Sequence, residues 1–478
     1  MVNLTRAASW LVTWKSKLTG AVDRALDDRL GDTVSVKDFG AVGDGITDDS
    51  AAFNAAISAL STSGGSVYVP TGNYKVLNLN IDVRTLDFHG NRVGFFGDGP
   101  ALSVLIGSNA ISSSYVMAVT ANTTEAANSV IAGVSFRDLG FEISNELGTP
   151  FKLVNTAYAH FSNCYFKGGR NAFESAGSLS SSFINCKFSE AAQHGFYAHD
   201  GFSYPNQLSF FQCVFTSNAL AGMYAINPGG LRIYGGSIEN NGASSTPTFG
   251  GGILIDTVKG ATGTSIPIVV SGAYFEFNKG LADLSITHAN NFCNTSFSVD
   301  GCSFGQGGTY TTVDCVHIVH TATSALRGTV SNCNFHELSG FVPTSAHQYI
   351  GISGSGTGYR SIFNVNNYFN TAALAPADQT TRIPATAGFA EARIEKFSAV
   401  TGASVATATV SFGMFAATPN VQVTVVDGTP NTIYSARIIA INANSCTVEV
   451  WKTTTNGGGT WIAATNTSVH ILAVGSSK

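Results

Sequence analysis

The chain has 478 residues, of which only 12% are charged, and its formal net charge is −5. Nucleic-acid binding rests on clustered Lys and Arg, so this composition argues against a nucleic-acid partner. No segment stays apolar for about 18 residues, which argues against membrane insertion. Charged residues interrupt residues 1–20, so we expect no secretion signal there. The 52 glycines and 32 phenylalanines are typical of a β-rich chain with many tight turns.

Helical patterning is confined to the beginning of the chain. Apolar residues from Leu4 to Leu26 recur at spacings of three and four, which predicts an amphipathic helical segment within residues 1–33. A terminal helix of this kind usually docks, either on further copies of the chain or on a larger particle. We therefore expect residues 1–33 to be an attachment segment.

A second, shorter helix is predicted from Ser50 to Leu60, with Phe53 and Ile57 on one face. The polar residues 47–49 precede it and are of the types that stabilise the first turn of a helix. Such a helix can close the open end of a stack of repeats, which would otherwise expose apolar side chains.

A six-residue unit of the form Phe-x-x-Cys-x-Phe recurs in the middle of the chain. Its clearest copies are Phe161–Phe166, Phe183–Phe188 and Phe210–Phe215. Looser copies begin at Phe136, Ile233, Val270, Val299 and Val330. The spacing between copies varies from roughly 22 to 37 residues, an irregular period that is typical of a solenoid.

Each unit is too short to be a helical repeat and is rich in Phe, Val and Ile, so it predicts a β-strand. Further short apolar strands lie between the units, as in Gly195–Ala198, Gly222–Ala225, Gly252–Ile255 and Cys315–Val319. Strands and turns that repeat in this way predict a parallel β-helix, where like positions stack about 4.8 Å apart. The cysteines of the unit then form an internal column of apolar filler rather than a metal or redox site. They are Cys164, Cys186, Cys213, Cys302 and Cys333.

Two segments near the start of the repeats carry a family resemblance. They read Asp38-Phe-Gly-Ala-Val-Gly-Asp-Gly-Ile-Thr-Asp-Asp49 and Gly65-Ser-Val-Tyr-Val-Pro-Thr-Gly-Asn-Tyr74. Together they resemble the opening of the pectate-lyase-like superfamily found in phage tailspikes and capsule depolymerases, and the resemblance covers roughly residues 34–370. In that family the opening is structural, so its acidic residues are given no catalytic role.

The expected fold class is all-β: a right-handed parallel β-helix with a short N-terminal helical segment and a C-terminal antiparallel β-sandwich. The resemblance also implies a homotrimer in the virion, attached to phage tail or adapter proteins through the N-terminal segment and acting at the host cell surface. It leaves the reaction open, because relatives include hydrolases, lyases and epimerases on one scaffold.

The pattern divides the chain after the N-terminal segment into three parts. The β-helix is predicted over residues 34–375, and a linker rich in Ala, Thr and Pro over residues 376–389. Residues 390–478 alternate apolar and polar side chains, which predicts a small antiparallel β-sandwich. This part is similar to H-type-lectin-like domains at the ends of phage tail fibres, which implies a trimer clamp. Sugar binding through Trp451 or Trp461 is the alternative.

A glycosidase needs two carboxyl groups beside a glycosidic oxygen. Aligning the repeats puts Glu239 and Glu276 at equivalent places on successive coils, so we expect their Cβ atoms about 5 Å apart. Two close like charges favour protonation of one partner, which gives an acid beside a base or nucleophile. The spacing suits a retaining mechanism, although long side chains leave the stereochemistry open. Alternatively, both are solvated turn residues beside an asparagine ladder of Asn218, Asn241 and Asn278.

Other residues are weaker candidates for the same site. Asp256 ends a strand on the coil of the first glutamate and is the third catalytic candidate, although strand-end residues are often only structural. Asp200 and Arg232 are predicted to bind substrate. Tyr197 and Tyr224 match in register and form an aromatic strip on which sugar rings can lie. These two rings could equally pack under a loop or against a neighbouring subunit.

The sequence therefore predicts an endo-glycosidase that recognises and depolymerises a bacterial surface polysaccharide, with no cofactor and no metal. A polysaccharide lyase ranks second, because it needs a cation and a base to act on a uronate. Arg232, Lys259, Lys279, His194 and His199 are the available groups. A glycan-binding fibre or adhesin without catalysis is the third possibility, and the acid pair in register argues against it.

Overall fold

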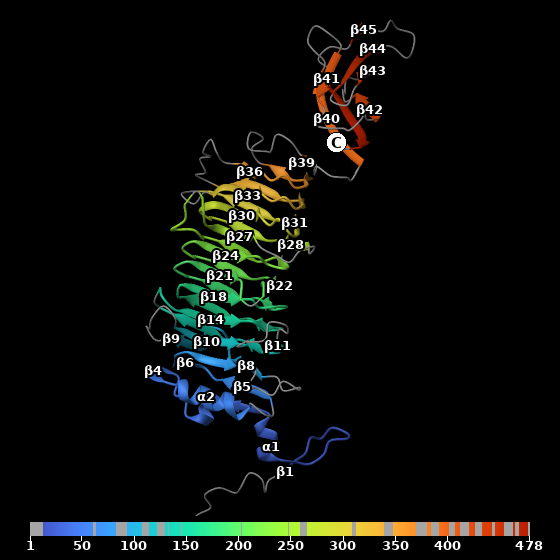
Figure 1. Cartoon of the computed structure of the whole chain (residues 1–478). Helices are drawn as coiled ribbons and strands as arrows, with labels where there is room; N and C mark the ends of the chain where they lie inside the picture. Colours follow the sequence, from blue (N-terminus) through green and yellow to red (C-terminus); the bar gives the residue numbers. More distant parts are fainter. Residues whose placement is uncertain are drawn as a thin grey trace, which may run out of the picture. The chain divides into compact units, whose positions relative to one another are not determined.

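The computed structural model describes residues 13–60, 64–82, 93–107, 114–121, 130–131, 133–144, 146–201, 203–246, 248–258, 265–307, 312–338, 348–369, 380–383, 392–400, 407–411, 420–425, 433–441, 445–453, 462–463 and 468–476. The chain divides into two compact units, Met1–Ile383 and Pro384–Lys478. The first is a long stack of short strands (Figure 1), and the expectation of a parallel β-helix is confirmed.

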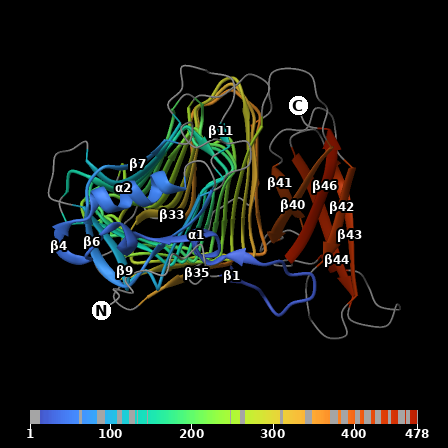
Figure 2. The ribbon, with the colours of Figure 1, turned by 90° about the horizontal axis from the view of Figure 1, so that it is seen from below.

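Three long sheets form the walls of the β-helix, which Figure 2 shows end-on. Sheet 1 consists of β3 (Thr33–Ser35), β5 (Gly65–Val69), β8 (Val93–Gly97), β12 (Ser135–Arg137), β16 (His160–Ser162), β19 (Ser182–Ile184), β22 (Leu208–Phe211), β25 (Leu231–Tyr234), β28 (Ser265–Ser271), β31 (Asn294–Asp300), β34 (Leu326–Ser331), β37 (Arg360–Val365) and β39 (Thr380–Ile383). Sheet 2 consists of β4 (Asp44–Asp48), β6 (Gly72–Val76), β9 (Ser103–Gly107), β13 (Gly140–Ile143), β17 (Tyr165–Gly168), β20 (Lys187–Ser189), β23 (Val214–Thr216), β26 (Ser237–Glu239), β29 (Tyr274–Glu276), β32 (Ser303–Gln306), β35 (Asn334–Glu337) and β38 (Tyr368–Phe369). Sheet 3 consists of β7 (Leu79–Asp82), β10 (Tyr115–Thr120), β14 (Thr149–Val154), β18 (Asn171–Ala176), β21 (His194–His199), β24 (Ala221–Ile226), β27 (Gly251–Thr257), β30 (Gly280–His288), β33 (Thr312–His320) and β36 (Gln348–Ser353). A short parallel pair, β11 (Val130–Ile131) and β15 (Thr156–Ala157), lies outside these sheets.

The repeated unit spans the bend from sheet 1 to sheet 2. In each clear copy, the residue before the cysteine has a left-handed backbone, with φ of 49° at Asn163, 51° at Asn185 and 51° at Gln212. Asn tolerates this conformation better than most residues with a Cβ atom. Each unit therefore consists of a strand, a corner residue with a left-handed backbone, a cysteine that points inward and a second strand.

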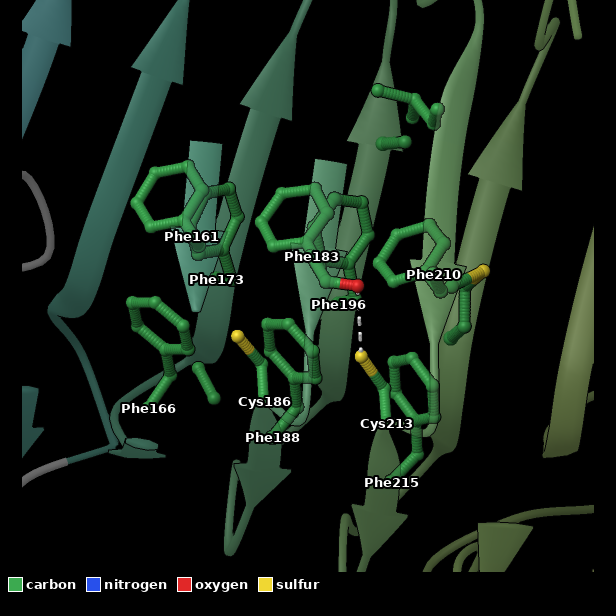
Figure 3. Packing of buried hydrophobic residues seen from close by; sticks show 14 of the residues in the cluster. Phe161, Phe166, Phe173, Phe183, Cys186, Phe188, Phe196, Phe210, Cys213 and Phe215 are labelled. Carbon is green, nitrogen blue, oxygen red and sulfur yellow. Dashed lines mark hydrogen bonds between the residues drawn. The ribbon is translucent and has the colours of Figure 1, made fainter. Parts of the chain in front are cut away.

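The interior is filled by columns of phenylalanine rings, one column on each wall (Figure 3). On sheet 1, Phe161 stacks on Phe183 with ring centroids 5.0 Å apart. On sheet 2, Phe166 and Phe188 are 5.2 Å apart, and Phe173 of sheet 3 meets both other columns edge-to-face. Offset stacks and edge contacts are the favoured ring geometries, so the columns hold adjacent coils in register.

The cysteines lie in the core as expected. All eight are buried and free. The Cys213 thiol contacts the Phe183 carbonyl of the preceding coil at 3.4 Å, and Cys164 contacts the Phe136 carbonyl in the same way at 3.5 Å. Their role as apolar filler between the phenylalanine columns is confirmed.

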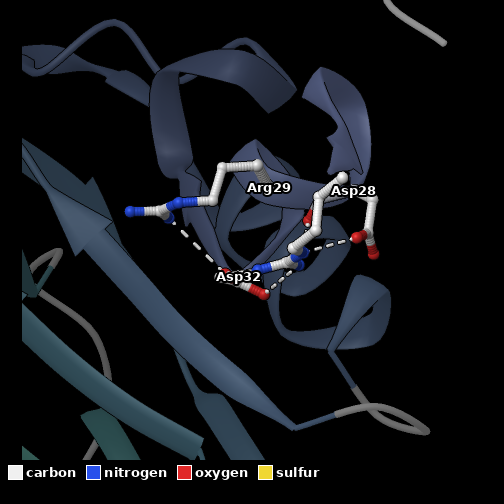
Figure 4. A network of polar contacts seen from close by, with 4 residues as sticks. Asp28, Arg29 and Asp32 are labelled. Atoms are coloured by element: carbon white, nitrogen blue, oxygen red, sulfur yellow. Dashed lines mark hydrogen bonds and ion pairs between the residues drawn. The ribbon is translucent and has the colours of Figure 1, made fainter. Parts of the chain in front are cut away.

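The N-terminal segment differs from the helix that the spacing predicts. Residues 1–12 lie outside the described part. Next come two short antiparallel strands, β1 (Thr13–Trp14) and β2 (Arg24–Ala25), and then α1 (Leu26–Gly31), so helix forms only in the last turns of the predicted range. Arg24 binds the carboxylates of Asp28 and Asp32 at 2.7 and 2.9 Å, and Arg29 also reaches Asp32 (Figure 4). The segment therefore carries an exposed charged network where the spacing predicted a helix.

The second helix forms as predicted, but the two aspartates that precede it have different hydrogen-bond partners. The helix α2 (Ser50–Ala59) buries Phe53 and Ile57 at the N-terminal end of the β-helix (Figure 1). The Asp48 carboxylate accepts a hydrogen bond from the Ser50 amide at 2.9 Å. Asp49 instead accepts from the Val42 and Gly43 amides, so it shapes the preceding loop and does not cap the helix.

The predicted linker contains a strand. Within residues 376–389, Thr380–Ile383 forms β39, which pairs antiparallel with β37 and belongs to the first unit. The second unit contains two antiparallel sheets. One has β40 (Ala392–Val400), β46 (Ser468–Ser476) and β42 (Asn420–Val425); the other has β41 (Thr407–Ser411), β44 (Ser445–Thr453), β43 (Ile433–Ile441) and the short β45 (Ile462–Ala463). The antiparallel strands are confirmed, and their packing into a sandwich stays a prediction. Trp461 lies outside the described residues.

Candidate functional site

The two glutamates lie opposite each other on sheet 2. Glu239 of β26 pairs directly with Glu276 of β29, and both side chains are half-exposed on the outer surface. The preceding residues, Ile238 and Phe275, point inward and are fully buried. Because side chains alternate along a strand, burial of one position places the next in solvent. The register expected from the repeat is confirmed.

Hydroxyl groups surround this glutamate pair. The Ser237 hydroxyl donates a hydrogen bond to Glu239 on the same strand. Tyr274 occupies the equivalent position on β29, opposite Ser237. Burial, the negative charge of Glu276 and a hydrogen bond with it raise the pKa of Tyr274 to about 12. Among the described residues, no Lys, Arg or His forms an ion pair with either glutamate, and Lys259 lies outside those residues.

An amide ladder lies directly behind the pair. Asn241 and Asn278 each follow a glutamate by two residues, turn inward and are fully buried. The Asn241 amide donates to Asn278 Oδ1 at 2.9 Å, and Asn278 donates to the Ile238 carbonyl at 2.8 Å. Asn218 continues the ladder by donating to Asn241 Oδ1 at 2.9 Å. The asparagine ladder is confirmed. It was expected as part of the alternative in which both glutamates are only solvated turn residues.

A second cluster of polar groups lies on the outer face of sheet 3. Tyr197 and Tyr224 are opposite each other in register, with ring centroids 5.8 Å apart. The Tyr224 hydroxyl donates to Asp256 Oδ2 at 2.8 Å, and burial and the Asp256 charge raise the pKa of Tyr224. His199 lies against Tyr197 with ring centroids 4.7 Å apart. The predicted register of the two tyrosines is therefore confirmed. Phe249, in the loop before β27, packs edge-on against Tyr224 with ring centroids 5.4 Å apart, so the alternative that the rings lie under a loop is also supported.

Glu174 is a member of this cluster that the sequence reasoning missed. Its carboxylate lies 3.3 Å from His199 Nε2 and 3.7 Å from Lys152 Nζ. Burial alone would raise the pKa of Glu174, but the His199 hydrogen bond and the Lys152 charge outweigh it and lower the pKa. The available signal was register, because Glu174 holds the same outward position as Tyr197 one coil earlier.

The other two predicted residues have clear structural partners. The Asp200 carboxylate accepts hydrogen bonds from the Asn227 amide at 3.0 and 3.1 Å, and the Asp200 carbonyl lies 2.9 Å from His199 Nδ1. It therefore ties the cluster to the next coil. Arg232 lies on β25 of sheet 1, where its guanidinium donates to Gln207 Oε1 of the preceding coil.

The candidates expected at one site are thus divided among three walls. The glutamates occupy sheet 2, the tyrosines with Asp200 and Asp256 occupy the region of sheet 3, and Arg232 occupies sheet 1. Asp256 shares a coil with Glu239, but β27 carries the chain five residues from Gly251 to Asp256, about 17 Å along sheet 3. We therefore treat the glutamate pair and the sheet 3 cluster as two separate sites.

A hollow of about 720 Å³ opens on sheet 1 and contains none of the predicted site residues. It is lined by Gly65, Ser66, Val93, Gly94, Gly133, Val134, Ser135, Tyr158 and His160. Within the described ranges, no group of three or more His, Cys, Asp or Glu side chains is placed to hold a metal ion. In the same part of the chain, no helix has the length and apolar character needed to cross a membrane.

A known protein family matches the N-terminal part of the β-helix. Residues 33–146, which contain the opening motif and the first coils of the observed β-helix, match the family described as rhamnogalacturonase A/epimerase, pectate lyase-like. This part of the chain is therefore similar to pectate-lyase-like proteins. The family resemblance inferred from the opening motif is confirmed.

Individual relatives match this chain over short stretches. It is 47% identical to the tail spike protein of an Escherichia phage over 76 residues, which are 16% of this chain and 9% of that protein. It is 58% identical to mannuronan C5-epimerase AlgE5 of Azotobacter vinelandii over 43 residues, 9% of this chain and 4% of the epimerase. The matches therefore span only a small part of either relative. The solved structure of ORF18 from Geobacillus virus E2 superposes on this chain with a TM-score of 0.47 and 16% sequence identity. The superposition covers 92% of this chain and 76% of ORF18.

Proposed function

We propose that this pectate-lyase-like chain is a phage tailspike that binds a bacterial surface polysaccharide and hydrolyses it at internal glycosidic bonds. The observation that carries the proposal is the pairing of Glu239 with Glu276 on the outer face of sheet 2. Two adjacent acids without a described cation repel each other, which costs stability, and a catalytic role explains why they are there. The match to a phage tail spike supports the biological setting.

The reaction follows from two carboxyl groups at this spacing. One glutamate, protonated, donates its proton to the glycosidic oxygen as the bond from that oxygen to the anomeric carbon breaks. The other, as a carboxylate, stabilises the positive charge on the sugar, either by bonding to the anomeric carbon or by activating water. Water completes the cleavage and leaves a new reducing end. The Ser237 and Tyr274 hydroxyls orient the two carboxyl groups for these steps.

The setting is part of the same proposal. As a tailspike, the chain forms a homotrimer, is attached to the phage tail or its adapter proteins through residues 1–33, and acts at the host cell surface. The C-terminal unit clamps the trimer. Size-exclusion chromatography with light scattering tests this part, since a monomer in solution contradicts it.

The test of hydrolysis uses the full chain and a panel of purified capsular and O-antigen polysaccharides. We expect new reducing ends from the wild-type protein, and Glu239→Gln and Glu276→Gln should each reduce their release by about a hundredfold or more. Glu142→Gln is the matched control, because Glu142 holds the same outward row of sheet 2 on an earlier coil. Full activity in both glutamate variants overturns the assignment.

A polysaccharide lyase acting at the sheet 3 cluster is the second candidate. The observation that favours it is the proximity of His199 and Tyr197 to Lys152 and Glu174, since a lyase needs a base and a cation for a uronate. This mechanism produces an unsaturated uronate that absorbs in the ultraviolet. Such a product, retained in Glu239→Gln and lost in His199→Gln, would move the active site to sheet 3.

Binding without either product is the third outcome of the same experiment. Retention of a polysaccharide from the panel, with no reducing ends and no unsaturated product, would make the chain a glycan-binding fibre and exclude both enzymatic proposals.

A further inference from the structure

Left-handed backbone conformations in the β-helix fall almost entirely on polar residues. Among the described residues, sixteen non-glycine residues have a positive φ, and fourteen of them are Asn, Asp, Ser, Gln or Glu. The two exceptions are Tyr158, with φ of 61°, and Phe277, with φ of 52°. Bulky residues are strained in this region, because their Cβ atom approaches the backbone.

Phe277 immediately follows Glu276. The residues at the same corner of the two preceding coils are Asn240, which follows Glu239, and Ser217. The Asn240 amide donates to the Glu276 carbonyl at 3.0 Å, and the Ser217 amide donates to the Glu239 carbonyl at 3.2 Å. The corner is therefore built equally well with small polar residues, and its geometry does not require an aromatic side chain.

The core does not explain this residue either. Phe277 is half-exposed, whereas Phe275 of the same coil is fully buried and stacks on Phe304. Within the described part of the chain, the Phe277 ring makes no aromatic contact. A strained, half-exposed ring beside two acids is a feature that stability alone would remove, and such strain concentrates at functional positions.

We propose that Phe277 is a substrate-binding residue, on which the apolar C–H face of a pyranose ring packs beside Glu239 and Glu276. This inference rests on the proposed function of the glutamate pair and adds a specificity determinant to it. Aromatic rings bind through their broad apolar faces, and a ring at this corner holds one sugar of the chain while its neighbour presents the glycosidic bond to the acids.

The experiment compares Phe277→Asn with Tyr158→Asn, which relieves the same backbone strain on another coil. Both variants should unfold at a higher denaturant concentration than the wild-type protein, because Asn suits a left-handed corner. On the panel polysaccharide that yields reducing ends, Phe277→Asn should raise KM about tenfold with a small change in kcat. Tyr158→Asn should leave both constants unchanged, and Phe277→Tyr should restore wild-type KM.

Two results overturn the inference. An unchanged KM in Phe277→Asn means that the ring does not contact substrate. A loss of stability or of oligomeric mass in Phe277→Asn means that the ring packs within the protein or against another copy.

The proposed function fails separately. If Glu239→Gln and Glu276→Gln keep full activity while Phe277→Asn loses affinity, the ring binds sugar but the acids do not cut it. If the wild-type protein neither binds nor cleaves any member of the panel, both proposals fall.

Discussion

Asn278 Nδ2 donates a hydrogen bond to Asp283 Oδ1 at 2.9 Å, and both side chains are fully buried. Gln306 donates to the other carboxylate oxygen of Asp283. The amide ladder behind the glutamate pair therefore ends on a buried acid. Burial raises the pKa of Asp283 to about 8, despite the two amide donors.

This buried acid predicts an unusual dependence of stability on pH. The folded-state pKa of Asp283 lies above its unfolded-state value of about 3.9, so the folded protein binds the proton more tightly. The stabilising contribution is fully present below the unfolded-state pKa and is lost as pH rises through about 8. Asp283→Asn should flatten this fall in the free energy of unfolding, measured by urea denaturation across the pH range.

Asp44 provides the opposite control. Hydrogen bonds from Thr47 and Ile46 lower its pKa, so its contribution is present at neutral pH and is lost on acidification. Asp44→Asn should therefore reduce stability at neutral pH and leave the fall toward alkaline pH unchanged. An Asp283→Asn variant with the same alkaline slope as the wild-type protein would contradict the prediction.

The ladder itself should be a major source of stability. Asn241→Ala removes donors to Asn278 Oδ1 and the Phe215 carbonyl, and it leaves both acceptors buried. We expect a loss of about 2–4 kcal/mol in the free energy of unfolding. The neighbouring exposed residue Asn240 offers the control Asn240→Gly, which keeps the left-handed corner and should change stability by less than about 0.5 kcal/mol. Equal stabilities in the two variants would show that the ladder contributes little.

The sheet 3 cluster predicts a coupled histidine titration. Burial alone would lower the pKa of His199, but hydrogen bonds to Glu174 and the Asp200 carbonyl outweigh it and raise the pKa. Glu174→Gln should therefore lower the pKa of His199, which NMR of the imidazole can follow. An unchanged titration would mean that the two side chains do not interact in solution.

The same pair should also stabilise the fold only within a pH window. A raised His199 pKa contributes stability that is present below the unfolded value of about 6.5 and is lost as pH rises through the folded value. The lowered Glu174 pKa contributes stability that is lost as pH falls through its own folded value. The difference in unfolding free energy between wild type and Glu174→Gln should thus be largest at mildly acidic pH.

The buried thiols should be chemically silent in the folded protein. All eight cysteines are buried, and burial raises the pKa of Cys186 and Cys315. The thiolate is the reactive form, so reaction with a disulfide reagent should proceed at the rate of unfolding. Cys164→Ser is an informative variant, because a hydroxyl in the apolar column should lower stability, and the other thiols should then react faster in proportion to the faster unfolding. Rapid reaction of the native protein would contradict the packing described here.

The repeat made the β-helix predictable. Phenylalanine at fixed positions of each unit must face the core, and a shift of one residue would expose a whole column, so register follows from composition. That constraint placed Glu239 beside Glu276 and Tyr197 beside Tyr224. The prediction of an N-terminal helix was wrong for Thr13–Ala25. An amphipathic helix is stable only when its apolar face packs against another surface. Leu18 and Val22 remain 76% and 71% exposed.

The site was less predictable than the fold. Aligning repeats fixes the height of a residue along the stack, but Asp256 and Glu239 share a coil and still lie on different walls. Arg232 was misjudged for the same reason. Glu174 was missed because it lies on β18 of sheet 3, outside the six-residue unit whose copies were aligned. Phe277 could not be predicted from the sequence, because phenylalanine does not indicate a left-handed backbone at that corner.

The phenylalanine columns allow the β-helix to be lengthened or shortened by the insertion or deletion of complete coils. Each coil touches chiefly the coils directly above and below it, and every clear copy of the unit offers the same ring to both neighbours. Gain or loss of one complete coil would therefore leave continuous columns and intact walls. The reach from the glutamate pair to either end of the solenoid is thus adjustable in steps of about 4.8 Å, without any redesign of the residues around it.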